Sequence, residues 1–249
     1  MALDDAAAKA AVLARYDARA SAELRGAGLF EPVNRAKQYF RRRKLEAALA
    51  LGAFPAGGSL LEIGCSIGQY TVPLAQQGYQ MWGMDLSPAS VEVAARRAAL
   101  QGASGARFVS GDAEDLGQFS DGRFDGVLSF STLRYVADLP AALREICRVL
   151  KPGGVAVLDF PNRWCPWFYL KPWLGSERHP LDHWFSASAV RRLMAEAGFQ
   201  DIRTRHLLFT PTVAPDPLVD LFAGLDRVGE RAPGLRRLAG IIMAAARRP

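Results

Sequence analysis

Two patterns of apolar and polar residues divide the chain. Residues 4–24 are rich in alanine, and residues 33–51 repeat apolar positions at helical spacing, so both segments predict helices. The run Pro55-Ala56-Gly57-Gly58 then interrupts the pattern. We therefore expect residues 1–55 to form a helical cover ahead of the rest of the chain.

After this break, short apolar runs alternate with helix-like segments. Ser87-Pro88 is typical of a helix start, because serine accepts an early backbone N–H and proline tolerates the first helical position. Asp138 is a second candidate cap, for a helix that carries an apolar stripe. The predicted strands cover residues 60–63, 80–84, 107–110, 124–130, 155–160, 202–209 and 238–247. Repeated strand–helix–strand units predict an α/β fold whose mostly parallel sheet is covered by helices.

The composition fits one globular domain over residues 1–249. Half of the residues are hydrophobic, 22% are charged, and no apolar run is long enough to span a bilayer. The acidic start Asp4-Asp5 argues against a secretory signal peptide, and the three cysteines lie too far apart for a disulfide framework or a CxxC metal pair. We therefore expect a cytoplasmic protein without a metal site.

The most informative segment runs from Leu60 to Gly68, where a predicted strand enters a tight turn containing glycine. The middle glycine of a dinucleotide motif is replaced by Ser66, and its last glycine is replaced by Gln69. A P-loop is excluded as well, because no lysine follows. The remaining pattern, an acidic residue, then Gly64 and Gly68, suits a nucleoside without a pyrophosphate.

Two acidic residues follow the next two predicted strands. Asp85 ends the second strand, 23 residues after Glu62, where a carboxylate can accept both hydroxyls of a ribose. The alternative for Asp85 is a helix cap or a turn. Ser110-Gly111-Asp112-Ala113 follows the third strand, and its alternative is an acidic surface turn.

Two further segments complete a family pattern: the strand residues 124–130 and the phrase Leu150-Lys151-Pro152-Gly153-Gly154. Taken together, residues 60–160 resemble the class I S-adenosylmethionine (SAM) dependent methyltransferases. The resemblance implies a Rossmann-like sheet of seven strands in the order 3-2-1-4-5-7-6, with the seventh strand antiparallel and helices on both faces. It departs from the family at Ser66, which should be tolerated in place of glycine if its φ is negative, and at Pro73, which predicts a kink or a late helix start.

The resemblance also implies that SAM lies across the carboxyl ends of strands one, two and four, and that S-adenosyl-L-homocysteine (SAH) is the product. In this family the aspartate matched by Asp112 receives the adenine amino group, and the backbone N–H matched by Ala113 meets a ring nitrogen. The cofactor-binding residues implied in this way are Glu62, Gly64, Cys65, Ser66, Gly68, Asp85, Leu86, Asp112, Ala113 and Ser129.

The acceptor side is expected around residues 161–185, an insert dense in aromatic residues that would form a lid over the acceptor pocket. An interfacial membrane patch and plain core packing are the alternatives. His183 is the candidate general base, against the alternative of a histidine bonded to a loop carbonyl; His179 and His206 complete the histidines. The candidate acceptor-binding residues are Tyr16, Tyr39, Tyr135, Trp164 and Trp184. A second insert, residues 210–237, is expected to be mostly helical.

These features predict methyl transfer to a small apolar or aromatic acceptor, such as a natural product, a lipid or a quinone-like compound, with oxygen slightly favoured as the methylated atom. Nitrogen or carbon methylation and a non-catalytic SAM-binding protein are the alternatives. Nucleic acid is disfavoured, because Ser129-Phe130-Ser131-Thr132 is not the loop of amino-methylating DNA enzymes and Cys165-Pro166 reverses the Pro-Cys nucleophile order. The sequence does not indicate an oligomeric state.

The formal net charge is +6, and basic residues gather at 35–44 and 227–248. The ordinary explanation is solvated helix faces. The alternative is attraction to an acidic substrate, a phosphorylated carrier or an anionic membrane surface, which makes peripheral membrane contact a candidate interaction of these basic helices.

Overall fold

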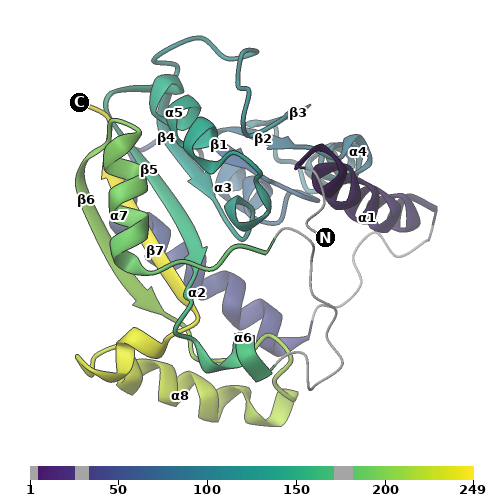
Figure 1. Ribbon diagram of the computed structural model, residues 1–249. Coiled ribbons are helices and arrows are strands. Elements are labelled where there is room, and N and C mark those ends of the chain that lie inside the picture. The colour runs from purple at the N-terminus through teal and green to yellow at the C-terminus, as the bar shows by residue number, and fades with distance from the viewer. Residues whose placement is uncertain (1–4, 26–33, 171–181) are drawn as a thin grey trace.

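Two helices precede the sheet, as the sequence predicts. The computed structural model describes residues 5–25, 34–170 and 182–249. Helix α1 (Asp5–Arg25) lies at one end of the molecule, and α2 (Arg35–Gly52) runs behind the sheet (Figure 1). Helix α2 starts at Asn34, whose side chain accepts a hydrogen bond from the Lys37 backbone at 2.9 Å. None of the described helices is long and apolar enough to cross a membrane.

Seven strands form one sheet in the order β3-β2-β1-β4-β5-β7-β6. Their bounds are β1 (Ser59–Ile63), β2 (Gln80–Asp85), β3 (Ala106–Ser110), β4 (Phe124–Ser129), β5 (Leu150–Pro161), β6 (Gln200–Leu207) and β7 (Ile241–Arg247). Strand β7 pairs antiparallel with both of its neighbours, and the other pairs are parallel. The predicted order and the antiparallel seventh strand are therefore confirmed.

Strand β5 begins earlier than the sequence predicts. Phe124 of β4 pairs with Leu150, and the register then shifts so that Gly126 pairs with Val155. The Lys-Pro-Gly-Gly turn therefore lies inside the strand as an irregularity, which explains why the apolar run alone starts only at Val155.

The connecting helices are α3 (Thr71–Gln76), α4 (Pro88–Leu100), η1 (Leu133–Tyr135), α5 (Leu139–Val149), α6 (Pro166–Leu170), α7 (Ala187–Glu196), η3 (Asp216–Leu218), α8 (Val219–Gly229) and η4 (Leu235–Leu238). Both predicted caps are confirmed: the Ser87 hydroxyl accepts the Ser90 N–H at 3.0 Å, and the Asp138 carboxylate accepts the Ala141 N–H at 2.9 Å. Helix α3 starts late, two residues before Pro73, whose missing N–H costs little in the first turn.

Successive side chains of each central strand enter different cores. Leu61 and Ile63 of β1 pack with α5 and α7, whereas Leu60 packs with α2 and α3 on the opposite face. Burial on both faces explains the nearly continuous apolar runs. The carboxyl ends of β1, β2 and β4 remain at one edge of this double core, where ligands of open α/β sheets bind.

Candidate active site

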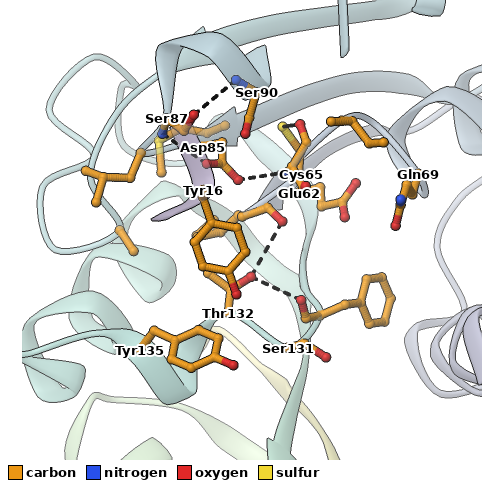
Figure 2. A pocket seen from close by; sticks show the side chains of 18 of the residues that line it. Tyr16, Glu62, Cys65, Gln69, Asp85, Ser87, Ser90, Ser131, Thr132 and Tyr135 are labelled. Carbon is orange, nitrogen blue, oxygen red and sulfur yellow. Dashed lines mark hydrogen bonds between the residues drawn. The ribbon is translucent and has the colours of Figure 1, made fainter. Parts of the chain in front are cut away.

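A cavity of about 390 Å³ lies over the carboxyl ends of β1, β2 and β4. Its wall combines α1 and α2 with the turn after β1, the start of α4, and the segments that follow β3 and β4 (Figure 2). The volume falls within the range of about 300–1,000 Å³ that is typical of small-molecule sites. The described residues therefore form a concave site where the sequence predicts one.

The turn after β1 wraps around the end of β2. The N–H groups of Gly64 and Cys65 both donate to the Met84 carbonyl, at 2.7 and 3.0 Å. Gly64 has a φ of 75°, and a Cβ there would overlap the Thr132 side chain after β4. Only glycine therefore permits the close approach of this turn to the end of β4.

Ser66 corrects one expectation. Its φ is +47°, not negative, so a serine occupies the left-handed region in which the family often has glycine. In this conformation its N–H donates to Asp85 Oδ2 at 2.8 Å. Backbone strain at Ser66 is thus offset by a charge-assisted hydrogen bond that ties the turn to β2.

Asp85 is held from two sides. Its Oδ2 accepts the Ser66 N–H, and its Oδ1 accepts the Ser87 N–H at 3.0 Å. Burial raises the pKa of Asp85, and these backbone hydrogen bonds oppose the rise. The side chain lines the cavity, and a carboxylate accepts several donors at once, so hydroxyl groups of a ligand can donate to Asp85 there.

Glu62 lies deeper under the same turn, 1% exposed. Burial raises its pKa to about 8, although the Thr71 hydroxyl, which donates to Oε2 at 2.5 Å, favours the charged form. Glu62 also lines the cavity. A cationic ligand group above it would favour ionisation of this carboxyl.

The segment after β3 is fastened to α1. Lys9 pairs with Asp112 and with Glu114, and the Asp112 Oδ1 accepts the Glu114 N–H at 3.0 Å. Asp112 and Ala113 both line the cavity. The role of Lys9 was not predicted from the sequence. Its position seven residues before Tyr16 places both residues on one face of α1, and this spacing could have indicated that Lys9 also faces the site.

Two aromatic pairs enclose the cavity. Tyr16 of α1 and Tyr135 of η1 face each other with ring centroids 6.2 Å apart (Figure 2). The pKa of Tyr16 is raised, mainly by its burial and in second place by the neighbouring Tyr135. The rings of Tyr70 and Phe130 lie 4.3 Å apart. The first pair joins two predicted acceptor-binding residues. The second was missed because Tyr70 stands in no recognisable motif and Phe130 was considered only as the end of a predicted strand.

A cluster of polar side chains between α2 and β5 was also not predicted from the sequence. Lys44 Nζ lies 2.6 Å from Ser131 Oγ and 2.5 Å from Asp159 Oδ2, and the Ser131 N–H donates to Asp159 Oδ1 at 2.6 Å. Lys44 lines the cavity, together with Lys37, Phe40 and Arg41 of the same helix. Their spacing places them on one helix face. Because a basic face of a helix is ordinarily exposed to solvent, the sequence predicted an exposed face and not a cavity wall.

Among the other predicted cofactor residues, Cys65 and Leu86 line the cavity. Gly68, at a φ of 74°, and Ser129, whose hydroxyl donates to the Ile63 carbonyl at 3.0 Å, are buried and not part of the lining. These two residues shape the backbone below the cavity.

The structure does not bring the other predicted acceptor residues into this cavity. Tyr39 is buried and its hydroxyl is bonded to Asp226. Trp164 is 58% exposed, and the Trp184 ring stacks on Phe168 at 5.3 Å. His183 is exposed, and its backbone N–H, not its imidazole, donates to the Arg134 carbonyl at 3.1 Å.

The described aromatic residues of the insert thus pack largely on one another, and the base role of His183 stays a prediction. Trp173 and His179 lie outside the described residues.

A family model described as "Methyltransferase domain" matches residues 61–158, from β1 into β5. This stretch contains the turn, Asp85 and Asp112. Residues 61–158 of this chain therefore match a methyltransferase domain, and the sheet has the strand order expected for the Rossmann-like fold of the class I SAM-dependent enzymes.

Relatives and solved structures are similar to this chain in the same region. Over 163 residues, 62% of this chain and 64% of the relative, the chain is 29% identical to a ubiquinone biosynthesis O-methyltransferase of Azorhizobium caulinodans. It is 33% identical to a malonyl-[acyl-carrier protein] O-methyltransferase of Serratia marcescens over 56% of this chain and 51% of that protein. The chain therefore spans less than two thirds of the length of either relative.

The crystal structure of magnesium protoporphyrin IX methyltransferase from Synechocystis PCC 6803, with bound SAH, shares the fold. Its TM-score is 0.67 at 19% identity, and the match covers 97% of this chain and all of that chain.

Proposed function

We propose that this methyltransferase domain binds SAM and methylates an oxygen of a small apolar or aromatic acceptor of the quinone-like class, releasing SAH. The observation that carries the proposal is the Asp85 carboxylate, fixed by the Ser66 and Ser87 N–H groups at the edge of the cavity. The names of the relatives, both O-methyltransferases, support oxygen as the methylated atom.

The lining residues fit an adenosyl group. Asp85 would accept the ribose hydroxyls, and the segment of Asp112 and Ala113 would meet the adenine. The methionine end would lie over Glu62 and the backbone of Gly64. When bound, SAM supplies a methyl group on a positively charged sulfur, so the protein has to provide orientation and a dry site.

Side chains of this domain would provide both the orientation of SAM and the exclusion of water. Helix α1 is tied to the segment after β3 by Lys9, which positions Tyr16 opposite Tyr135 above the cavity and limits the access of water. Tyr70, Phe130 and the α2 face form the other end, which we assign to the acceptor. Aromatic rings at that end suit an apolar or aromatic acceptor.

Lys44 is the candidate for handling the acceptor oxygen. An ammonium has three N–H donors; that of Lys44 donates to Ser131 and forms an ion pair with Asp159, which leaves a donor for the acceptor oxygen. A cation beside a phenol or carboxylic acid lowers the pKa of that group, which allows the oxygen to lose its proton before it gains the methyl group. This role favours acidic oxygens over amines.

His183 remains a second candidate, as general base. Its backbone N–H donates to the carbonyl of Arg134, whose neighbour Tyr135 lines the cavity, so His183 lies near that end of the site. With a methyl acceptor, His183→Ala is expected to lower kcat more than SAM affinity, as a residue acting on the acceptor would. A kcat equal to that of the wild type removes His183 from the mechanism.

The proposal is tested by calorimetric titration of the purified chain with SAM, followed by turnover assays with matched acceptors. Dihydroxybenzoates and hydroquinones are expected to be methylated, and aniline analogues of the same shape are not. No heat of binding with SAM would overturn the cofactor assignment. Methylation of the anilines alone would overturn the assignment of oxygen.

A further inference from the structure

The end of the molecule formed by η3, α8 and η4 exposes apolar side chains to solvent. Leu221, Leu225 and Val228 follow one another at helical spacing on α8 and are 61%, 52% and 67% exposed. The opposite side of α8 buries Val219 and Ala223 against the domain. We call the exposed set the α8 apolar face: Leu218, Leu221, Leu225, Val228, Leu235 and Leu238.

Single exposed leucines are ordinary, but a contiguous set on an amphipathic helix marks an interaction surface. Helix α6 extends this surface. The Trp167 indole donates to the Phe209 carbonyl at 3.0 Å, and Gly229 of α8 packs against the Phe209 ring, so both helices contact one residue. Tyr169 and Leu170 of α6 are about half exposed, and Figure 1 shows α6 and α8 at the same end.

A cationic pocket borders the α8 apolar face. It has a volume of about 590 Å³, and its lining includes the exposed Trp164 and four arginines, namely Arg191, Arg205, Arg236 and Arg237. Arg236 and Arg237 belong to η4, which also carries Leu235 and Leu238 of the apolar face. Two adjacent arginines are therefore flanked by two leucines in the same short segment.

The pocket has little acid to balance these charges. Its lining contains one acidic residue, Glu230, within the described parts of the chain. Glu230 is already engaged, because it pairs with Arg43 at 2.7 Å and accepts the Leu208 N–H at 3.1 Å. It also pairs with Arg205 at 3.4 Å, so the positive charges of the pocket still outnumber its one carboxylate. Burial, and then the charges of Arg236, Arg191 and Arg237, lower the pKa of His206 in the same pocket, as expected for an excess of positive charge.

We propose that this end of the molecule docks on an anionic phospholipid surface. The α8 apolar face enters the boundary between headgroups and acyl chains, and the arginines of the pocket bind headgroup phosphates. Trp164, an amphipathic ring at the rim of the pocket, lies at headgroup depth. An anionic membrane is thus a single partner that would contact both the arginines and the apolar side chains.

Other binding partners would fit this combination of charged and apolar side chains less well. A symmetric second copy would bring the same arginine cluster toward itself, which repels at a twofold interface. A nucleic acid would engage the arginines but leave the leucines in water. The surface is connected to the helix that lines the cavity, since Arg35 at the start of α2 pairs with Asp220 of α8 at 3.0 Å and Lys37 of α2 lines the cavity. An acceptor dissolved in the membrane would therefore be near the site.

The test is co-sedimentation of the intact chain with vesicles of phosphatidylcholine alone or of phosphatidylcholine and phosphatidylglycerol in equal parts. We expect binding to the anionic vesicles only, weakened by salt. Leu221→Ser with Leu225→Ser, and separately Arg236→Gln with Arg237→Gln, should each lower the bound fraction at least about fivefold. The matched controls are Leu100→Ser on α4, where Leu100 is 68% exposed, and Arg144→Gln on α5, and both should bind like the wild type.

Three results would overturn the proposal: wild-type protein that stays in the supernatant, equal binding to both vesicle types, or double variants that bind like the controls. A dimer that the leucine variants dissociate, without vesicle binding, would assign the surface to a second copy. Calorimetry with SAM on every variant separates the two questions, because the surface changes should leave SAM affinity within about twofold.

Discussion

Lys44 of α2 and Asp159 of β5 form an ion pair in which both side chains are 1% exposed. The pair contacts Ser131, two residues after β4, with Lys44 donating to its hydroxyl and Asp159 accepting its N–H. Ser131 has a φ of 57°, an uncommon conformation for serine that these contacts maintain. The pair therefore connects the helical cover to the edge of the sheet at which the acceptor is proposed to bind.

Breaking this pair should be costly. Lys44→Met leaves the Asp159 carboxylate buried without its cation, and we expect the free energy of unfolding to fall by about 3–5 kcal/mol. Adding Asp159→Asn should recover part of the loss, since the amide oxygen still accepts the Ser131 N–H and no charge is buried alone. Urea unfolding monitored by circular dichroism measures both variants.

The matched control is the Arg96–Glu92 pair on α4, in which both side chains are more than half exposed. Arg96→Met should change stability by less than about 0.5 kcal/mol. If the losses from Lys44→Met and Asp159→Asn simply add in the double variant, the two charges are not coupled and the buried pair does not stabilise this connection.

Asp85 should govern cofactor affinity. Asp85→Ala removes the acceptor proposed for the ribose hydroxyls, and we expect SAH to bind about 1–3 kcal/mol more weakly, roughly 5- to 150-fold. Calorimetric titration with SAH measures the change. Asp121→Ala, at a carboxylate that is 71% exposed, is the control and should bind SAH as the wild type does. Unchanged affinity in Asp85→Ala would remove this residue from the cofactor site.

The fold follows from the sequence because its signals are local. Ser87 and Asp138 act as caps through contacts three residues away, and apolar runs on both faces mark buried strands. The start of β5 at Leu150 was missed because it depends on pairing with Phe124 across a register shift, which no local pattern encodes. The positive φ of Ser66 was missed for a similar reason, since its partner is the Asp85 carboxylate on another strand.

The residues of the candidate site that follow the strands at the edge of the sheet could be predicted from the sequence. Asp85, Asp112 and the turn follow successive strands, and parallel strands bring their carboxyl ends together. The acceptor end was harder, because Lys44 and Tyr70 line the cavity only through the packing of α2 and the turn. Aromatic density pointed to the insert, but the Trp184 ring there stacks on Phe168. Aromatic composition does not distinguish a pocket wall from local packing.

The raised pKa of Glu62 predicts a pH dependence of stability. Burial shifts the pKa of this carboxyl from 4.5 to about 8 in the folded protein. Between these values the folded protein holds a proton that the unfolded chain has released, so the free energy of unfolding falls as pH rises, by at most about 1.4 kcal/mol per pH unit. Glu62→Gln cannot ionise and should remove this part of the slope.

Urea unfolding of wild type and Glu62→Gln at a series of pH values between 5 and 8 checks this prediction. The variant should gain stability relative to the wild type as pH rises, while the exposed Glu92→Gln should follow the wild type. Parallel curves for wild type and Glu62→Gln would show that Glu62 is charged throughout this range.

Gly64 is expected to be required for both stability and cofactor binding. Gly64→Ala places a Cβ at a φ of +75° and against the Thr132 side chain, whereas Gly102→Ala places one at +65° with nothing nearby. The second variant isolates the cost of a left-handed alanine, about 1–2 kcal/mol. Gly64→Ala should lose more than this in urea unfolding, because Thr132 and the turn must separate, and it alone should weaken SAH binding. Equal losses in the two variants, with wild-type SAH affinity in both, would mean that the turn tolerates displacement from β4 without affecting the site.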